Sequence, residues 1–266
     1  MLRDITLGQY FPGKTIVHRL DPRTKLILTI VYVVTLFLAK SWTSYAFMAC
    51  ILAGIVLTSR IGLRTMLKNL KPIVLVILFT AVLNMFFTRG EVLLEFWIIK
   101  LTREGLITAG KMTVRLILLI SGTFLLTYTT SPIALTDGLE TLLKPLKKIR
   151  FPVHELALMM ALALRFVPTL IEETDKIMSA QKARGADMET GGVFKRARAL
   201  IPVLVPLFIS AFRRADDLAE AMESRCYHGG QGRTRMKVLH MSANDVVALL
   251  LGLAVIAAIL LANLLP

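Results

Sequence analysis

Two stretches decide the fold: Leu116–Thr136, LILLISGTFLLTYTTSPIALT, and Val246–Pro266, VVALLLGLAVIAAILLANLLP. Neither stretch contains a charged residue, and each has about the 20 mostly apolar residues that a helix needs to cross the hydrocarbon core of a bilayer. The whole 266-residue chain shares this character, because it is 55% hydrophobic with a mean hydropathy of +0.66. The sequence therefore predicts an all-α integral membrane protein.

Three further apolar segments extend this pattern. Ser41–Ser59 and Pro72–Thr88 are similar but shorter. Leu26–Ala39 lies between Lys25 and Lys40, whose long side chains can reach the membrane interface from either end. We therefore expect about five transmembrane helices.

The basic residues indicate a membrane topology. The formal net charge is +14, but the 32 Lys and Arg lie between apolar segments, which argues against a nucleic-acid-binding domain. Basic residues concentrate before the first span, in the 60–71 loop and before residue 151, whereas the turn at Lys40 has few. This asymmetry predicts that the N-terminus and the 60–71 loop are cytoplasmic. The segment 89–115 contradicts the pattern, because it should be external and carries five basic residues: Arg89, Lys100, Arg103, Lys111 and Arg115.

The stretch Asp137–Met241 is too polar to insert throughout and too apolar to be a disordered loop. Apolar residues recur at helical spacing in two parts of it, from Leu164 to Met178 and from Phe208 to Cys226, with charged residues on the other faces. We therefore expect a module of amphipathic helices at the cytoplasmic face. The predicted organisation is a four-span membrane part (1–136), this module (137–241) and a C-terminal transmembrane helix (242–266).

Each amphipathic helix is expected to end on a basic tripeptide, Ala183-Arg184-Gly185 in the first and Ser224-Arg225-Cys226 in the second. An arginine at a helix C-terminus complements the helix dipole, and glycine suits a left-handed cap, so either tripeptide alone is explained by capping. The pair also suits docking of two related soluble partners with acidic grooves, because the planar guanidinium binds carboxylates bidentately. Capping and docking both stay open at this point.

In these features the chain resembles the transmembrane T component of energy-coupling factor (ECF) transporters, and it is similar to cobalt-uptake membrane subunits as well. The resemblance covers essentially the whole chain. It rests on Gly8–Gly13 (GQYFPG), on His18–Lys25 (HRLDPRTK) and on the two tripeptides. The run His18–Lys25 also has a plain structural role, since Asp21 before Pro22 is a common start of a helix.

The resemblance implies that the chain is a coupling subunit of an importer in the bacterial cell membrane. Two partner ATPase subunits would hydrolyse ATP, and a separate membrane S component would bind the vitamin or other micronutrient. The tripeptides would end two coupling helices, each reaching a groove on one ATPase. Ala183, Arg184 and Gly185 match the family pattern, whereas Ser224, Arg225 and Cys226 share only the central arginine.

One motif is misleading. Gly8–Thr15, GQYFPGKT, matches the phosphate-binding pattern G-x-x-x-x-G-K-[ST]. Such a loop requires a strand before it and a helix directly after it within an α/β sheet, and only seven residues precede Gly8. We therefore expect no nucleotide binding by this segment.

No catalytic, cofactor or metal residues are predicted, because the four histidines lack metal-ligand spacing and no hydrolase motif is present. Lys111 and Arg115 share a helix face and would either snorkel to the interface or mark a conducting path. The alternative function is a self-contained secondary carrier or membrane enzyme. That alternative would require intramembrane acids or inverted repeats, neither of which stands out.

Overall fold

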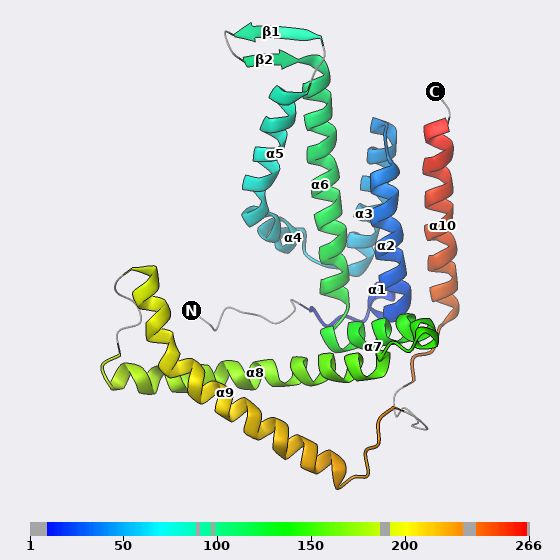
Figure 1. The fold of residues 1–266 in the computed structure, drawn as a ribbon. Coiled ribbons are helices and arrows are strands. Elements are labelled where there is room, and N and C mark those ends of the chain that lie inside the picture. Colours follow the sequence, from blue (N-terminus) through cyan, green and yellow to red (C-terminus); the bar gives the residue numbers. More distant parts are fainter. Residues whose placement is uncertain (1–9, 89–90, 97–98, 187–191, 231–237, 265–266) are drawn as a thin grey trace. The chain divides into compact units, whose positions relative to one another are not determined.

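The structure is a computed structural model that describes residues 10–88, 91–96, 99–186, 192–230 and 238–264 (Figure 1). The chain forms two compact units. The described residues of Gly8–Thr141 and Val238–Pro266 form the first, which we call the bundle unit, and those of Leu142–Lys237 form the second, which we call the helix-pair unit.

The bundle unit is built from eight α-helices, and the last two residues of α7 belong to the helix-pair unit. They are α1 (Ile16–Arg19), α2 (Pro22–Leu38), α3 (Trp42–Ser59), α4 (Leu63–Leu70), α5 (Val74–Phe87), α6 (Arg103–Thr129), α7 (Pro132–Leu143) and α10 (Ala243–Leu264). A 3-10 turn at Lys71–Ile73 joins α4 to α5. The helix-pair unit contains a 3-10 helix (Lys144–Ile149), α8 (Val153–Ala183) and α9 (Val193–Glu223).

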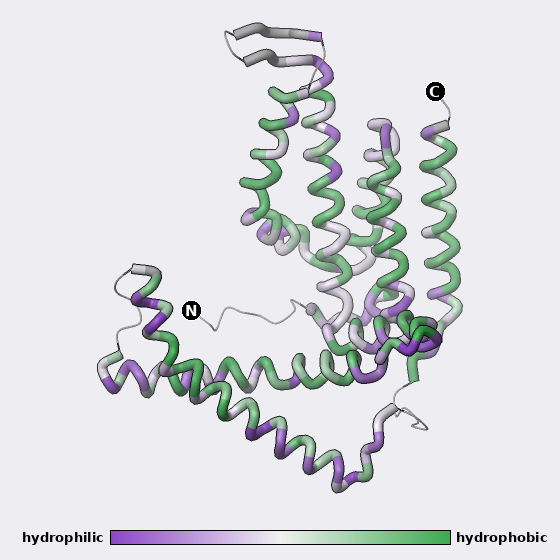
Figure 2. The backbone as a smooth tube through the Cα atoms, in the orientation of Figure 1, coloured by the Kyte–Doolittle hydropathy of each residue, from purple (hydrophilic) through white to green (hydrophobic). Residues whose placement is uncertain are grey.

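Among the described residues, five helices are long and apolar enough to cross a membrane. They are Trp42–Ser59, Leu63–Phe87, Arg103–Thr129, Val153–Ala183 and Ala243–Asn263. Much of the apolar surface of α5 and α10 is exposed, as expected for helices that face lipid (Figure 2). The predicted fold class, an all-helical membrane protein with about five spans, is therefore confirmed.

The candidate spans differ from the predicted ones in identity and in boundaries. α8 (Val153–Ala183), predicted as part of the cytoplasmic-face module, is among the five candidates. The predicted first span, Leu26–Ala39, corresponds to the 17-residue helix α2, which is not among them.

The expected helix Leu116–Thr136 is instead α6, which begins 13 residues earlier at Arg103 and ends at Thr129. Pro132 starts the separate helix α7, because proline disfavours helical backbone in the residue before it and donates no hydrogen bond. The first half of α6 contains Lys111 and Arg115, so it lies outside the uncharged apolar run.

A short antiparallel hairpin, which the sequence pattern did not predict, joins α5 to α6. Its strands are β1 (Val92–Phe96) and β2 (Ile99–Thr102), with an irregular register between Val92 and Leu94. Thr102 caps α6 by accepting a hydrogen bond from the backbone N–H of Gly105 at 3.1 Å.

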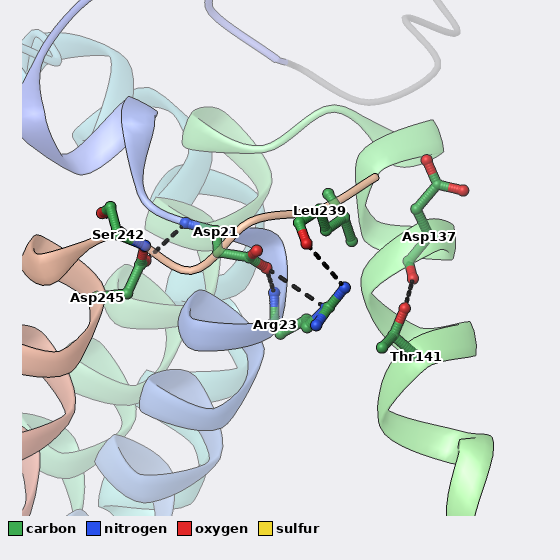
Figure 3. A network of polar contacts seen from close by, with 7 residues as sticks. All are labelled: Asp21, Arg23, Asp137, Thr141, Leu239, Ser242 and Asp245. Atoms are coloured by element: carbon green, nitrogen blue, oxygen red, sulfur yellow. Dashed lines mark hydrogen bonds and ion pairs between the residues drawn. The ribbon is translucent and has the colours of Figure 1, made fainter. Parts of the chain in front are cut away.

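The start of α2 is bonded to the start of α10 through two buried aspartates (Figure 3). The backbone N–H of Asp21 donates to Oδ1 of Asp245 at 2.8 Å, and the side chain of Asp21 caps α2 by accepting from the N–H of Arg23 at 2.9 Å. Oδ2 of Asp245 accepts from both the N–H and the hydroxyl of Ser242, each at 2.8 Å. Asp21 is therefore the helix cap that its place before Pro22 predicts, and it also joins two helices 224 positions apart.

The start of α2 is also bonded to the end of α6. The ammonium group of Lys25 donates to the carbonyl of Thr129 at 2.9 Å and to that of His18 at 3.0 Å. Lys25 is buried, so these two acceptors replace the water that a lysine would otherwise keep.

The other end of α2 is bonded to the same two neighbours. Arg115 of α6 donates to the carbonyl of Ala39 at 3.1 Å and to the hydroxyl of Tyr45 at 2.6 Å. Asn263 near the end of α10 donates to the carbonyl of Leu38 at 2.8 Å. Arg115 therefore holds the turn between α2 and α3, which explains how a charged residue is accommodated within the helix.

Between its ends, α2 packs closely against α6 and α10 at two glycines. A Cβ atom at Gly122 would lie 2.3 Å from the ring of Tyr32, and one at Gly252 would lie 2.6 Å from Leu28. Small residues at helix contacts are the usual means of close packing in a membrane.

We expect Asp245→Asn to destabilise the bundle unit. Asparagine replaces one acceptor oxygen with an NH2 group, so one of the three donors facing this side chain loses its partner, at a cost of about 1 to 3 kcal/mol. Thermal unfolding in detergent measures the effect, with the exposed neighbour Asn244→Ala as control. A stability equal to that of the parent protein would show that the bond between α2 and α10 is dispensable.

Candidate functional site

The two long helices of the helix-pair unit run antiparallel and cross (Figure 1). Three contacts give the direction: His154 with Tyr227 (3.4 Å), Glu173 with Arg214 (2.5 Å) and Gln181 with Pro202 (3.3 Å). From the first contact to the third, the residue number rises along α8 and falls on the α9 side, so the helices are antiparallel. The carboxylate of Glu173 also accepts from the hydroxyl of Ser210. The C-terminal ends of α8 and α9 therefore lie at opposite ends of the pair.

The prolines in these helices do not end them. Pro168 lies within α8, and Pro202 and Pro206 lie within α9, each of which continues for 31 residues. The carbonyl of Pro202 accepts the bond from Gln181, so one of these positions contributes to the contact between the helices. Each helix is about 45 Å long at the usual rise per residue.

The first tripeptide forms a left-handed helix cap. α8 ends at Ala183, Arg184 follows as the cap residue, and Gly185 has a φ of +84°. The N–H of Gly185 donates to the carbonyl of Lys182 and that of Ala186 donates to the carbonyl of Gln181, both at 3.0 Å. This bond pair is the Schellman motif, which favours glycine at the left-handed position.

The second tripeptide forms the same motif with a different residue. The N–H of Cys226 donates to the carbonyl of Glu223 at 2.8 Å, and that of Tyr227 donates to the carbonyl of Met222 at 3.0 Å. Cys226 has a φ of 55° and takes the place of Gly185, although a left-handed conformation costs a residue with a side chain about 1 to 2 kcal/mol. The two tripeptides therefore differ in sequence but have the same backbone conformation.

The shared motif places the two arginines equivalently. Arg184 and Arg225 each directly precede the left-handed residue, and the N–H of each donates to the carbonyl three residues earlier, at 3.1 and 3.2 Å. All six tripeptide residues are exposed, and within the described part of the chain neither arginine forms an ion pair. The fold thus presents two free guanidinium groups at opposite ends of one helix pair.

The equivalence of Cys226 and Gly185 was not predicted from the sequence. The sequence feature that indicates it is the alignment of the two tripeptides, in which Cys226 occupies the position of Gly185, a residue that suits a left-handed cap. Propensity argued against the equivalence, because cysteine rarely adopts positive φ.

The N-terminal segment is not built as a phosphate loop. A Cβ atom at Gly13 would lie 2.7 Å from the imidazole of His18, so the glycine admits this ring. Nε2 of His18 donates to the carbonyl of Phe11 at 3.1 Å, and Nδ1 accepts from the hydroxyl of Thr15 at 2.7 Å. Burial and the charge of Lys25 lower the pKa of His18, which favours the neutral imidazole. Gly8 and Gln9 lie outside the described residues.

Other proteins resemble this chain over most of its length. A family model described as a cobalt transport protein matches residues 13–237. The energy-coupling factor transporter transmembrane protein EcfT of Thermosediminibacter oceani is 56% identical, over 93% of both chains. Proteins of the same name from Clostridium kluyveri and Bacillus subtilis are 53% and 47% identical, over 96% and 98% of both chains.

The two caps should respond oppositely to substitution. Gly185→Ala places a side chain in a left-handed position and should destabilise the protein by about 1 kcal/mol, whereas Cys226→Gly relieves such strain and should stabilise it by about 0.5 kcal/mol. Thermal unfolding of the purified chain in detergent measures both changes. If the two substitutions shift the midpoint in the same direction, the ends are not the equivalent caps described above.

Proposed function

The chain belongs to the family of energy-coupling factor transporter transmembrane proteins, and we propose that Arg184 and Arg225 couple it to two ATPase subunits. As a family member it is a non-catalytic membrane component of an ECF transporter. This membership sets aside the alternative of a self-contained carrier or membrane enzyme. We further propose that the chain passes the movements of the ATPases to an S component that binds a vitamin or other micronutrient.

The observation that carries this proposal is the repeated cap geometry. Two exposed arginines stand at the same position of the same motif, at opposite ends of an antiparallel helix pair. A single capping arginine needs no partner, but two equivalent ones at opposite ends of the helix pair suit two related partners. Each guanidinium can bind a carboxylate in an acidic groove with two parallel hydrogen bonds.

The contact between α8 and α9 supports transmission of movement. Glu173 accepts bonds from Ser210 and Arg214, and both members of the ion pair are partly buried. A displacement at the Arg184 end would therefore shift α9 as well as α8, as in rigid-body mechanisms of coupling. The left-handed caps hold each arginine at a defined backbone position before a partner binds.

We propose that the helix-pair unit and the N-terminus both lie on the cytoplasmic side of the cell membrane. Although α8 is long and apolar enough to span, basic residues flank it at both ends: Lys144, Lys147, Lys148 and Arg150 before it, and Arg184, Lys195, Arg196 and Arg198 after it. A spanning helix would carry this excess on one side only. If α8 lies along the membrane interface, the basic residues at both of its ends can be on the cytoplasmic side.

Arg184→Ala and Arg225→Ala should each weaken assembly with the ATPases or uncouple ATP hydrolysis from uptake. Truncating one partner of a buried charge pair costs about 2 to 5 kcal/mol, whereas losing an exposed helix-dipole contact costs about 0.3 to 1 kcal/mol. The double substitution should be worse than either, and lysine should rescue only in part, because an ammonium group lacks the planar fork. Co-purification and solute uptake in reconstituted vesicles measure these effects.

The matched controls are Lys176→Ala on α8 and Arg213→Ala on α9, which remove exposed charges from the same helices away from their ends. Both controls should assemble and transport like the parent protein. If the two end variants do so as well, the arginines are ordinary caps and the coupling proposal is wrong.

The proposed orientation predicts which positions an impermeant thiol reagent reaches. In a chain carrying Cys50→Ala and Cys226→Gly, Lys147→Cys should be labelled only after the cells are opened. Lys40→Cys, in the turn between α2 and α3, should be labelled in intact cells. Thr190, which also lies in the predicted cytoplasmic module, is outside the described residues. Labelling of Lys147→Cys from outside would contradict the topology.

A further inference from the structure

A cavity of about 840 Å³ lies in the bundle unit at the end of α3. One wall is the segment from Phe11 to His18, and the other runs from Leu57 to Thr65, across the turn between α3 and α4. The wall at Phe11 is tied to the end of α6, because the N–H of Phe11 donates to the carbonyl of Tyr128 at 3.0 Å and the two rings pack edge to face. The cavity thus lies between two segments that are distant in sequence.

The charge of this cavity suits an anion. Lys14 and Arg60 line it from opposite walls, both are exposed, and none of the lining residues is acidic. Gly62 lines the cavity directly before α4, and the first turn of that helix carries the partial positive charge of a helix N-terminus. Arg60 has a φ of 55°, which turns the chain between the two helices.

The rim of the cavity is apolar and exposed. Ile16 and Leu57 line it and are 67% and 71% exposed, and Leu63, which follows the lining residue Gly62, is 63% exposed. A free phosphate ion would leave these apolar side chains exposed to water, whereas the acyl chains of a lipid would cover them. A basic cavity with an apolar rim therefore matches a molecule with a phosphate head and a hydrocarbon tail.

A nucleotide fits this cavity less well. In a phosphate loop the backbone N–H groups around the glycine and lysine surround the phosphates. Here the imidazole of His18 occupies the space beside Gly13 and bonds with Phe11 and Thr15. Lys14 is left as a point charge on one wall, which suits a head group held from the side.

We propose that this cavity binds the phosphate head group of an anionic phospholipid, with Lys14 and Arg60 on either side of it. The lipid would hold the N-terminal segment against the turn between α3 and α4. The site is distinct from the two arginine caps, and it requires neither the ATPases nor the S component.

The test is native mass spectrometry of the purified full chain in detergent, titrated with dioleoylphosphatidylglycerol or dioleoylphosphatidylcholine. Phosphatidylglycerol should bind more tightly. Lys14→Gln and Arg60→Asn should each weaken its binding about fivefold, and together about 25-fold, since a basic residue near an anionic lipid contributes about that factor. Asparagine is chosen at position 60 because it tolerates the left-handed conformation. The pair Lys14→Arg and Arg60→Lys, which keeps both charges, should retain most of the binding.

The control is Lys68→Gln, which removes an exposed charge from α4 outside the cavity and should leave binding unchanged. The proposal is overturned if the two lipids bind equally or if the double variant, with an unaltered circular dichroism spectrum, binds like the parent chain.

Inorganic phosphate at millimolar concentration distinguishes the source of the phosphate group. If it displaces the lipid as effectively as dioctanoylphosphatidylglycerol does, the cavity is a site for free phosphate. If the double variant does not fold, the single substitutions and the charge-retaining pair decide the outcome.

Discussion

The bundle unit depends on α2 being bonded at both ends to the same two helices. Asp245 and Asn263 of α10 bind the first and last turns of α2. α6 does the same through the carbonyl of Thr129 at its C-terminal end and the side chain of Arg115 near its middle. Lipid is as apolar as a leucine side chain, so the hydrophobic effect contributes little to helix association in a bilayer. These polar bonds therefore determine which turn of one helix faces which turn of the next.

This arrangement also accounts for the run His18–Lys25, of which helix capping is only one part. His18 supports the segment from Phe11 to Thr15, Asp21 joins α2 to α10, and Lys25 joins α2 to α6. The run thus lies where four elements meet. Arg115 has a structural role of the same kind, because its bonds to Ala39 and Tyr45 hold a turn and need no role in conduction.

Composition and spacing predicted the helical membrane class, because uncharged apolar runs of about 20 residues are rare in soluble domains. They did not predict the limits of α6, because the charges of Lys111 and Arg115 interrupt the apolar run before it and the run continues past Pro132 after it. The contact between Asp21 and Asp245 could not be predicted from the sequence either, because it joins residues far apart in the chain. For the tripeptides, the sequence shows two similar basic helix ends, but the matching backbone at Cys226 is visible only in the structure.

The two caps reach one geometry by different physical means. At the end of α8 a Cβ atom added at Gly185 would meet none of the described residues within 4 Å, so the left-handed turn relies on the intrinsic freedom of glycine. At the end of α9 the following chain returns to the start of α8, where Tyr227 bonds with His154 and a Cβ atom at Gly230 would lie 2.4 Å from the same imidazole. These tertiary contacts offset the strain at Cys226, as surrounding structure does at other strained positions. At the Arg225 end the tertiary contacts therefore follow the left-handed residue, whereas at the Arg184 end the contact between Gln181 and Pro202 precedes the cap, so the two ends present the same group on different supports.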